Sequence, residues 1–401
     1  MLIRENYLSK IRGFYNSNLI KILVGIRRCG KSVILNQIIE EIRENNDVDL
    51  EHIININFEF IEYEELRDYK KLNSYIKGKI KDKKMYYIFL DEIQNVSKFE
   101  EVINSLRASL DNISIFITGS NSKMTFMELS TDLSGRYVSF RVNPLTFKEI
   151  VELTNTNKEN YEELLLDIFE WGGLPQRFSF KDERARLNYI SDVYDSILLK
   201  DVVERLNIKD ITSFNKILQY VLETEGKEFS ANNVMKYLKT EHHDIATDTL
   251  YSYLDALCST FIMNKVYRYD IQGKAVLKTL NKYYASDLGV KKIKTNNKEL
   301  NYSIAMENLV FNELIAKGYE VYIGKTKKGE VDFVATRDKD LKYIQVCYKL
   351  GTEETINREF GAYDSINDSY PKYVISLDEE DYSYNGIKHV NIFEFLMDDE
   401  F

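Results

Sequence analysis

The stretch VGIRRCGKSV at residues 24–33 decides the fold of the first part of this chain. It follows the apolar run IKILVG at 20–25 and precedes VILNQIIEEI at 33–42, where apolar residues recur at helical spacing. Between them the residues fit G-x-x-x-x-G-K-[ST], a pattern whose glycines let backbone N–H groups wrap around phosphates at a helix N-terminus. A strand, a loop and a helix in this order predict a phosphate-binding loop.

The side chains of this loop have expected roles toward a nucleotide. Lys31 is expected to neutralise the β- and γ-phosphates of ATP, and Ser32 to reach Mg²⁺. Cys29, close to a helix N-terminus, has two interpretations: an acidic, oxidation-prone thiol or a tolerated small residue. The expected ATP-binding residues are Gly25, Arg28, Cys29, Gly30, Lys31, Ser32 and Val33.

Hydrolysis of ATP also needs a metal carboxylate and a group that activates water. MYYIFLDEI at 85–93 predicts a buried parallel strand followed by both. Asp91 is expected to hold Mg²⁺ through water, and Glu92 to polarise the attacking water. The next apolar run, ISIFITGSNS at 113–122, ends in Thr118, Ser120 and Asn121, polar groups suited to sensing a γ-phosphate, and Asn121 is the catalytic candidate among them.

Arg136 is the candidate arginine finger of this set. It lies in LSGRY at 133–137, after the γ-phosphate-sensing segment. It has two possible sites of action, the nucleotide of its own chain or that of a neighbouring subunit, and the second requires at least a dimer. Arg27 and Arg28 in the loop are alternative phosphate contacts.

These four motifs together carry a resemblance to a known family. GIRRCGKS, IFLDEI, ITGSNS and LSGRY resemble the AAA-type ATPases that bacteria and archaea fuse to a family-specific C-terminal domain. The resemblance continues through WGGLP at 171–175 and LLKDVVERLNI at 198–208. It implies an α/β protein with a P-loop NTPase core of parallel sheet and flanking helices, a helical lid, a winged helix and a small α/β domain of PD-(D/E)xK nuclease-like architecture.

The expected domain boundaries follow this order. The AAA-type P-loop ATPase domain takes residues 1–155, the helical lid 156–206, the winged helix-turn-helix domain 207–295 and the nuclease-like domain 296–401. Helical patterns at 211–263 are compatible with a helix-turn-helix, and two apolar runs around a glycine-containing turn predict the wing.

The predicted wing begins the most basic segment of the chain. Residues 265–298 contain nine Lys or Arg against two acidic residues, interleaved with tyrosines. One interpretation is a face for duplex DNA, where basic side chains contact phosphates. The other is an interdomain or subunit contact whose charges are solvated.

The last part of the chain shows a degraded nuclease pattern. Glu307 in a helix, Asp332 in a strand and Gln345 in the next strand follow the order of the PD-(D/E)xK nucleases, whose carboxylates bind Mg²⁺. Gln345 is neutral, however, and Cys347 occupies the position of the catalytic lysine. A lysine from elsewhere, such as Lys325 or Lys342, is one possible replacement. We expect a nuclease-derived binding or partner-sensing domain in which Glu307 and Asp332 are retained for structure or for weak metal binding, with an active nuclease as the less favoured alternative.

Composition sets the remaining bounds. The 401 residues, 44% of them hydrophobic, are enough for several domains, and the net charge of −10 disfavours a coat for unspecific nucleic-acid binding. Three widely spaced cysteines predict neither disulfides nor a zinc site. Without a signal-peptide pattern or a long apolar run, we expect a cytoplasmic protein with no membrane partner.

Two functions are compatible with these features. The first couples Mg-ATP hydrolysis to a nucleic-acid-associated activity through the winged helix and a degenerate nuclease-like domain. The alternative is a nucleotide-controlled signalling switch that recognises a protein partner at its C-terminal domain, with no nucleic-acid chemistry. Either is compatible with a homo-oligomer.

Overall fold

The computed structural model describes residues 2–46, 48–120, 136–204, 208–295, 300–327 and 329–401. They form two compact units. Unit 1 comprises the residues up to Val142 together with Ser259–Phe261, and unit 2 comprises Asn143–Cys258 together with Ile262–Phe401.

Unit 1 is built on a five-stranded parallel sheet with the order β2-β3-β4-β1-β5. The three inner strands are buried along their whole length, as expected for parallel strands covered on both faces. The strands are β1 (Ile20–Val24), β2 (Ile53–Asn57), β3 (Tyr86–Asp91), β4 (Ile113–Gly119) and β5 (Tyr137–Arg141).

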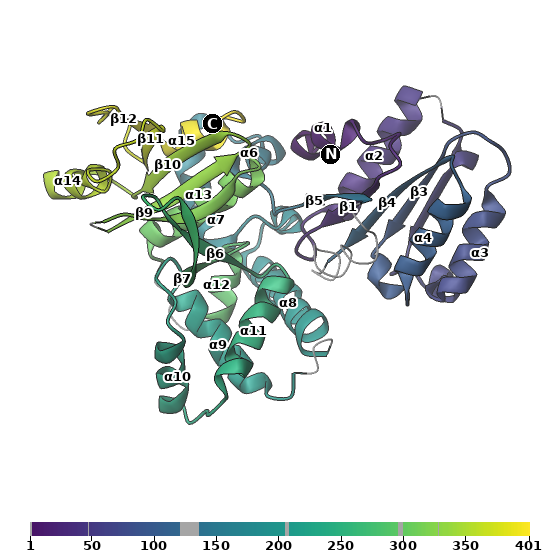
Figure 1. The fold of residues 1–401 in the computed structure, drawn as a ribbon, viewed down its shortest axis with the longest axis horizontal. Coiled ribbons are helices and arrows are strands. Elements are labelled where there is room, and N and C mark those ends of the chain that lie inside the picture. The colour runs from purple at the N-terminus through teal and green to yellow at the C-terminus, as the bar shows by residue number, and fades with distance from the viewer. Residues whose placement is uncertain (1, 47, 121–135, 205–207, 296–299, 328) are drawn as a thin grey trace. The chain divides into compact units, whose positions relative to one another are not determined.

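Helices cover both faces of this sheet, α1 and α2 on one side and α3 and α4 on the other (Figure 1). Right-handed crossovers explain this division, because the chain moves from β1 to β2 in one direction across the sheet and returns in the other. The helices are α1 (Glu5–Arg12), α2 (Lys31–Asn46), α3 (Tyr69–Lys79) and α4 (Phe99–Ser109), with 3₁₀ turns at Leu50–His52, Ile61–Arg67 and Ile93–Asn95. The predicted P-loop core of parallel sheet and flanking helices is confirmed.

Unit 2 begins with helices. Thr146 starts the first of them with a capping box in which its side chain and that of Glu149 bind each other's backbone N–H groups. The helices are α6 (Phe147–Thr154), α7 (Tyr161–Trp171), α8 (Glu183–Ser196), a π-helix at Ile197–Glu204, α9 (Ile211–Glu223), α10 (Ala231–Thr240), α11 (Thr247–Ser259) and α12 (Gly289–Lys294), with 3₁₀ turns at Lys158–Asn160 and Pro175–Ser179. None of the helices in the described ranges combines the length and the apolar character that a membrane crossing requires.

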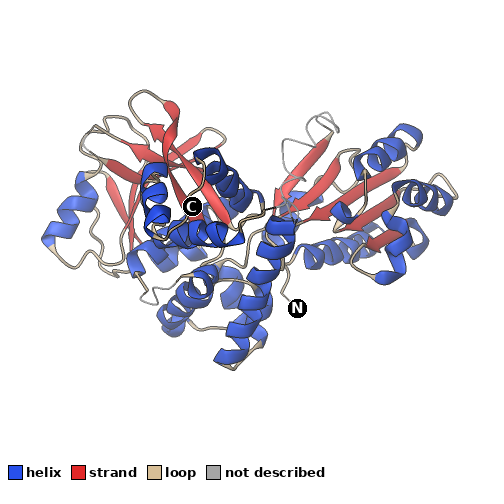
Figure 2. Cartoon of the chain, turned by 90° about the horizontal axis from the view of Figure 1, so that it is seen from below, coloured by secondary structure: helices blue, strands red, loops and turns tan. Residues whose placement is uncertain are grey.

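A seven-stranded mixed sheet completes unit 2, visible as the larger group of strands in Figure 2. Its order is β12-β11-β10-β9-β8-β6-β7. The strands are β6 (Met263–Asp270), β7 (Ala275–Ala285), β8 (Glu320–Lys325), β9 (Glu330–Arg337), β10 (Asp340–Val346), β11 (Lys372–Ser376) and β12 (Ile387–Asn391), accompanied by α13 (Tyr302–Ala316), α14 (Glu353–Gly361) and α15 (Ile392–Met397).

The hairpin expected as a wing is part of this sheet. Its strands β6 and β7 pair antiparallel, and β6 also pairs in parallel with β8. The ladder satisfies backbone groups that an exposed edge of β6 would leave unpaired. One sheet therefore runs across the expected boundary at 295/296, and the division into lid, winged helix and nuclease-like domain stays a prediction.

Candidate nucleotide-binding site

The candidate site lies at the carboxyl edge of the parallel sheet in unit 1. The loop after β1 and the residues that end β3 and β4 all reach this edge, because the three strands run in the same direction. Ligands of open parallel sheets bind at this edge, where the strand order reverses. Here β4 separates β1 from β3, and the loop therefore faces the acidic pair across one strand.

The loop has the tight backbone that its glycines predict. A Cβ atom at Gly25 would lie 2.0 Å from the carbonyl oxygen of Val142, so no larger residue fits there. Gly30 has a φ of +103°, a left-handed conformation that glycine adopts without strain. Arg4 of the N-terminal segment donates from Nη1 to the carbonyl oxygen of Cys29 at 2.9 Å and so braces the loop from outside.

Lys31 points into the loop that precedes it. Its side chain is buried, and Nζ donates to the carbonyl oxygens of Gly25 at 3.0 Å and Ile26 at 3.2 Å. The same ammonium lies 3.9 Å from Oε1 of Glu92. The loop and the end of β3 are therefore close enough to act on one ligand.

Asp91 is held on both of its carboxylate oxygens. The Thr118 hydroxyl donates to Oδ1, and Nδ2 of Asn57 donates to Oδ2 at 3.0 Å. Burial raises the pKa of Asp91, while hydrogen bonds from Thr118 and Ser32 act in the opposite direction. Ser32 and Asp91, the two expected Mg²⁺ ligands, are thus already in contact.

Glu92 is placed by its backbone as well as its side chain. It adopts a left-handed conformation with φ +54°, and its N–H donates to Oγ1 of Thr118 at 2.9 Å. Its carboxylate accepts a hydrogen bond from Nε2 of Gln94, which also lies 3.3 Å from Oγ of Ser120. The polar ends of β3 and β4 therefore form one connected network.

Comparisons with known proteins agree with this geometry. Residues 17–151 match the family model of an AAA domain. An uncharacterized protein of Haemophilus influenzae is 32% identical over 403 residues, which cover 99% of both chains. The chain belongs to the family of this Haemophilus protein. Its unit 1 accordingly carries an AAA-type P-loop ATPase domain, called the AAA domain below.

The rest of the chain matches families whose function is not known. Residues 162–300 and 302–395 match two domains of unknown function, DUF8612 and DUF4143. An uncharacterized protein of Methanocaldococcus jannaschii is 29% identical over 365 residues, covering 86% of this chain and 78% of that protein.

Two solved structures show low similarity to this chain. Cdc6p of Pyrobaculum aerophilum shows 13% identity and a TM-score of 0.31, covering 66% of this chain and 88% of that one. AMPPCP-bound DnaA of Aquifex aeolicus shows 14% identity and a TM-score of 0.31, covering 64% and 89%.

Cys29 of the AAA domain is not an acidic thiol. It is fully buried, and its Sγ donates to the carbonyl oxygen of Val142 at 3.3 Å. Burial raises its pKa more than the nearby charge of Lys31 lowers it. The oxidation-prone interpretation is therefore wrong, and Cys29 acts as a small residue that fills the space under the loop.

Other expected residues lie apart from this network. Arg28 and Val33 are exposed on the loop and at the start of α2. Asn121 lies outside the described residues. Arg136 lies just before β5, where its carbonyl oxygen accepts from the N–H of Ile20 at 3.0 Å.

That position puts Arg136 at the amino edge of the sheet. The loop leaves β1 at the other end, and the four residue steps from Ile20 to Val24 span about 13 Å. An exposed Arg136 side chain at this edge does not face the loop of its own AAA domain. For an arginine finger, this position favours the nucleotide of a neighbouring copy over the nucleotide of the same chain.

Sequence reasoning missed Asn57 and Gln94. Asn57 ends a strand whose register against β3 places it opposite Asp91, and no local pattern specifies that register. Gln94 is two residues from Glu92, and its contact with the Glu92 carboxylate cannot be predicted before the left-handed turn at Glu92 is known. Both position the acidic pair.

In unit 2, the structure brings the three expected remnants together. The N–H of Asp332 donates to Oε1 of Gln345 at 3.2 Å, and the charge of Glu307 acts on Asp332. Lys342 Nζ donates a hydrogen bond to the Tyr319 hydroxyl at 2.8 Å, and Tyr319 is not one of the three remnants. Lys342 pairs with Asp340, and Lys325 lies near Asp270; among the described residues neither forms an ion pair with Glu307 or Asp332.

The lysine that does lie at these remnants is Lys282 of β7. Sequence reasoning assigned it to the wing and therefore missed it. Only the pairing of the hairpin with β8 brings it to this place.

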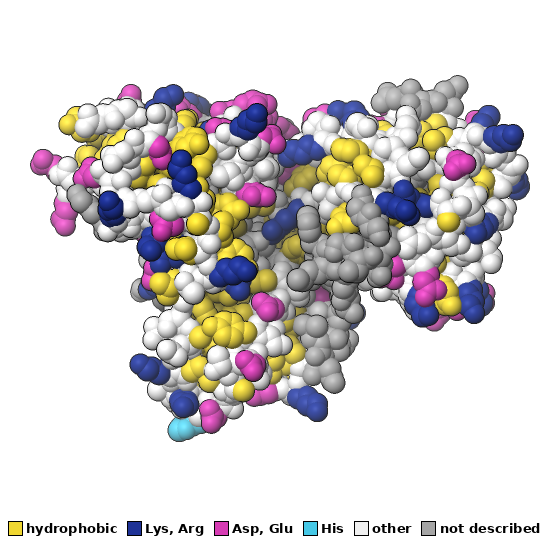
Figure 3. Space-filling model, viewed as in Figure 1, with side chains coloured by type: hydrophobic (Ala, Val, Ile, Leu, Met, Phe, Trp, Pro, Cys, Tyr) yellow, Lys and Arg dark blue, Asp and Glu magenta, His cyan; other side chains and the backbone are white. Residues whose placement is uncertain are grey.

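The basic segment 265–298 is largely neutralised within unit 2. Arg268 pairs with Glu228 at 2.7 Å and Lys291 with Glu225 at 2.7 Å. Further ion pairs join Lys282 to Glu330, Lys292 to Glu170, and Lys294 to Asp195. On the face shown in Figure 3, Lys and Arg side chains stand singly or in small groups among other side chains.

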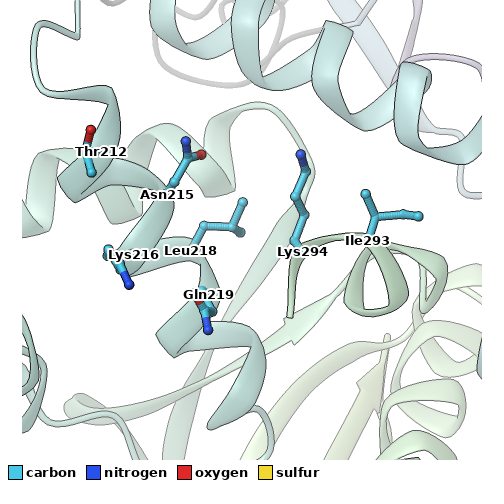
Figure 4. Close-up of a pocket in the computed structure, with 7 residues that line it drawn as sticks. All are labelled: Thr212, Asn215, Lys216, Leu218, Gln219, Ile293 and Lys294. Atoms are coloured by element: carbon cyan, nitrogen blue, oxygen red, sulfur yellow. The ribbon is translucent and has the colours of Figure 1, made fainter. Parts of the chain in front are cut away.

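A separate hollow of about 280 Å³ lies between α9 and α12 in unit 2 (Figure 4). Both lysines at its rim are paired, Lys216 with Glu241 at 2.7 Å and Lys294 with Asp195. Its lining is Thr212, Asn215, Lys216, Leu218, Gln219, Ile293 and Lys294. It lies outside unit 1 and is no part of the candidate nucleotide site.

Proposed function

We propose that the AAA domain hydrolyses Mg-ATP, with Lys31 binding phosphate and Glu92 activating water. The observation that carries the proposal is the convergence of the loop with the end of β3, seen in the 3.9 Å between Lys31 Nζ and Glu92 Oε1. A P-loop match alone would support nucleotide binding. A carboxylate of the right kind beside the loop lysine supports hydrolysis.

The residues present suit Mg²⁺. The Ser32 hydroxyl and the Asp91 carboxylate are the oxygen donors that Mg²⁺ prefers, and they are hydrogen-bonded to each other. When bound, the ion would neutralise charge on the β- and γ-phosphate oxygens. Thr118 and Asn57 keep the Asp91 carboxylate oriented for this role.

Lys31, Glu92 and Arg136 then have separate roles in the reaction. The Lys31 ammonium exchanges its carbonyl partners in the loop for phosphate oxygens, and the loop N–H groups and the N-terminus of α2 add to phosphate binding. Glu92 orients a water and accepts its proton. Arg136 is proposed to stabilise the charge on a nucleotide held by a neighbouring copy.

Steady-state phosphate release and binding of a fluorescent ATP analogue test this assignment. Lys31→Ala should lose both nucleotide binding and turnover. Glu92→Gln should bind ATP with near-normal affinity while turnover falls at least about a hundredfold, since the interaction removed is needed for the reaction. Lys83→Ala, a change of the same charge on an exposed loop of unit 1, serves as the control. Normal turnover by Glu92→Gln would remove Glu92 from the proposed role.

For the use of this ATPase, we infer a nucleotide-controlled switch that recognises a protein partner through unit 2. The supporting observation is that five of the eight described basic residues at 265–298 are engaged in ion pairs. Duplex DNA stays the second candidate and would be limited to the remaining three near the hairpin, Lys265, Lys274 and Lys278. Light scattering with ATP or ADP in the Glu92→Gln protein tests the switch, which predicts a nucleotide-dependent oligomeric state; an unchanged mass would contradict it.

A further inference from the structure

The remnants Glu307, Asp332 and Gln345 in unit 2 surround a buried lysine. Lys282 enters from β7, and its ammonium reaches Glu307 of α13 and the start of β9. A pocket of about 490 Å³ opens beside this group, and its lining includes Glu330, Asp332 and Gln345.

The Lys282 ammonium is enclosed by carboxylates. The residue is 4% exposed. Its Nζ forms an ion pair with Glu330 and lies 3.7 Å from Oε1 of Glu307. The same Glu307 oxygen accepts a hydrogen bond from the Tyr284 hydroxyl at 2.5 Å. Lys282 and Tyr284 are two residues apart in β7, so their side chains lie on the same face of the strand. The ammonium and the hydroxyl therefore both face Glu307 of α13.

The other remnants are occupied by protein partners. Oδ2 of Asp332 accepts from the N–H of Val346 at 2.8 Å, and its own N–H is bonded to Gln345. Nε2 of Gln345 donates to Glu359 at 2.8 Å. Glu359 in turn accepts from the guanidinium of Arg358. Asp332 and Gln345 thus use their hydrogen-bonding groups on each other and on neighbouring residues of unit 2.

These residues do not fit the Mg²⁺ that the nuclease resemblance implies. One of the three ligand positions is a neutral amide, and a fixed positive charge already lies among the carboxylates. In the part of the chain that the structure describes, no group of three or more His, Cys, Asp or Glu residues is arranged to hold a metal ion.

We infer that the Lys282 ammonium is the permanent cation of this carboxylate group, so that unit 2 binds no divalent metal ion there and has no metal-dependent phosphodiester cleavage. A divalent ion at the same place would bring two more positive charges within a few ångströms of the ammonium, in a site that is poorly screened by water.

Mn²⁺ titration of the full chain without nucleotide, followed by electron paramagnetic resonance, tests this inference. Lys282→Met removes the charge but keeps an unbranched apolar side chain. This variant should bind one Mn²⁺ more per chain than the wild type does in the same titration. Adding Asp332→Asn to Lys282→Met should abolish the gained site.

Two variants control for charge. Lys282→Arg keeps the positive charge and should gain no site. Lys216→Met removes an ammonium that pairs with Glu241 elsewhere in unit 2, and it should gain none either. Mn²⁺ bound at the nucleotide site is common to all variants and cancels in the comparison.

Two outcomes would overturn the inference. One is a folded Lys282→Met protein with no more Mn²⁺ than the wild type. The other needs no Lys282 variant: a Mn²⁺ site of the wild-type chain that disappears in Asp332→Asn would mean that the group accepts a metal beside its lysine. The second measurement decides the matter if Lys282→Met does not fold.

Discussion

Lys21 shows how a strand with an apolar pattern can hold a charged group. It lies in β1 and is 0% exposed. Its Nζ donates to Oγ of Ser114 at 2.7 Å and to the carbonyl oxygen of Ser17 at 3.1 Å, and lies 4.5 Å from the ring centre of Phe116. Burial, together with the charge of Arg107, lowers the pKa of Lys21 from 10.5 to about 7.

Lys21 should make the stability of unit 1 depend on pH. Between about pH 7 and 10.5 the unfolded chain keeps the proton on Lys21 and the folded chain does not, so its contribution to the free energy of unfolding rises with pH. Below pH 7 both states are protonated and the contribution is constant. The wild type should therefore gain stability relative to Lys21→Met by up to about 1.4 kcal/mol per pH unit in this window.

Chemical unfolding followed by circular dichroism at pH 7, 8 and 9 measures this difference. Lys83→Met, at an exposed position of the same unit, should show a difference from the wild type that does not change with pH. The same flat difference for Lys21→Met would contradict the assignment.

Thr118 is expected to position both acidic residues of the nucleotide site. Its hydroxyl donates to Asp91 and accepts from the N–H of Glu92. Thr118→Val keeps the shape but removes the hydroxyl, and kcat should fall about 10- to 100-fold, as for other groups that orient metal ligands. Thr118→Ser should restore most of the activity in the same phosphate-release assay. A fully active Thr118→Val protein would show that the acidic pair needs no such support.

At the scale of elements, the WGGLP motif links helices of unit 2 through a buried carboxylate. Gly172 ends α7 with φ +73°, and the N–H of Gly173 donates to Oδ2 of the fully buried Asp287. The Tyr194 hydroxyl of α8 donates to Oδ1 of the same carboxylate at 2.7 Å. One carboxylate thus ties α7 and α8 to the segment that leads into α12.

Gly172→Ala should disrupt the hydrogen bonds of Asp287 with Gly173 and Tyr194. The new Cβ would lie 2.1 Å from Oδ1 of Asp287, which must move away from partners that it needs when buried. We expect a loss of at least about 3 kcal/mol in the free energy of unfolding of unit 2. Fluorescence of Trp171, the single tryptophan, reports the transition.

Gly318→Ala is a matched control for this change. Gly318 also has a positive φ, +89°, but a Cβ added there would have no heavy atom within 4 Å. It should lose only the conformational term of about 1–2 kcal/mol. Equal losses for the two variants would mean that the contact with Asp287 is unimportant.

At the scale of the whole molecule, internal pairing limits the charge available to DNA. The chain carries a net charge of −10, and three described lysines in the basic segment have no ion pair among the described residues: Lys265, Lys274 and Lys278. If duplex DNA binds through them, the logarithm of the binding constant should fall against the logarithm of salt with a slope no steeper than about −2.7.

Fluorescence anisotropy with a labelled duplex at several salt concentrations gives this slope. Replacing the three lysines by alanine should abolish the binding, and the same replacement at Lys81, Lys83 and Lys84 of the AAA domain should not. A much steeper slope would show that the paired lysines leave their carboxylates to contact DNA, against the switch that we favour.

Much of the AAA domain was predictable because its signals are local. The strand, loop and helix around GIRRCGKS and the placement of Asp91 and Glu92 at a strand end follow from runs of fewer than about 20 residues. Whether Asn57 or Lys282 meets a carboxylate depends instead on strand register and on pairing between distant segments. A hairpin has the same local pattern whether it stands as a wing or extends a sheet.

The sequence by itself thus determined the phosphate-binding loop, its strand and helix, and the acidic residues that follow the second buried strand, because backbone conformation and periodicity specify them within a few residues. Only the tertiary structure decided that Arg136 lies at the opposite edge from its own loop, that five basic residues of the 265–298 segment are paired, and that Lys282 lies among the carboxylates. Charge acts through space, and which charges meet depends on how strands from distant parts of the chain pair.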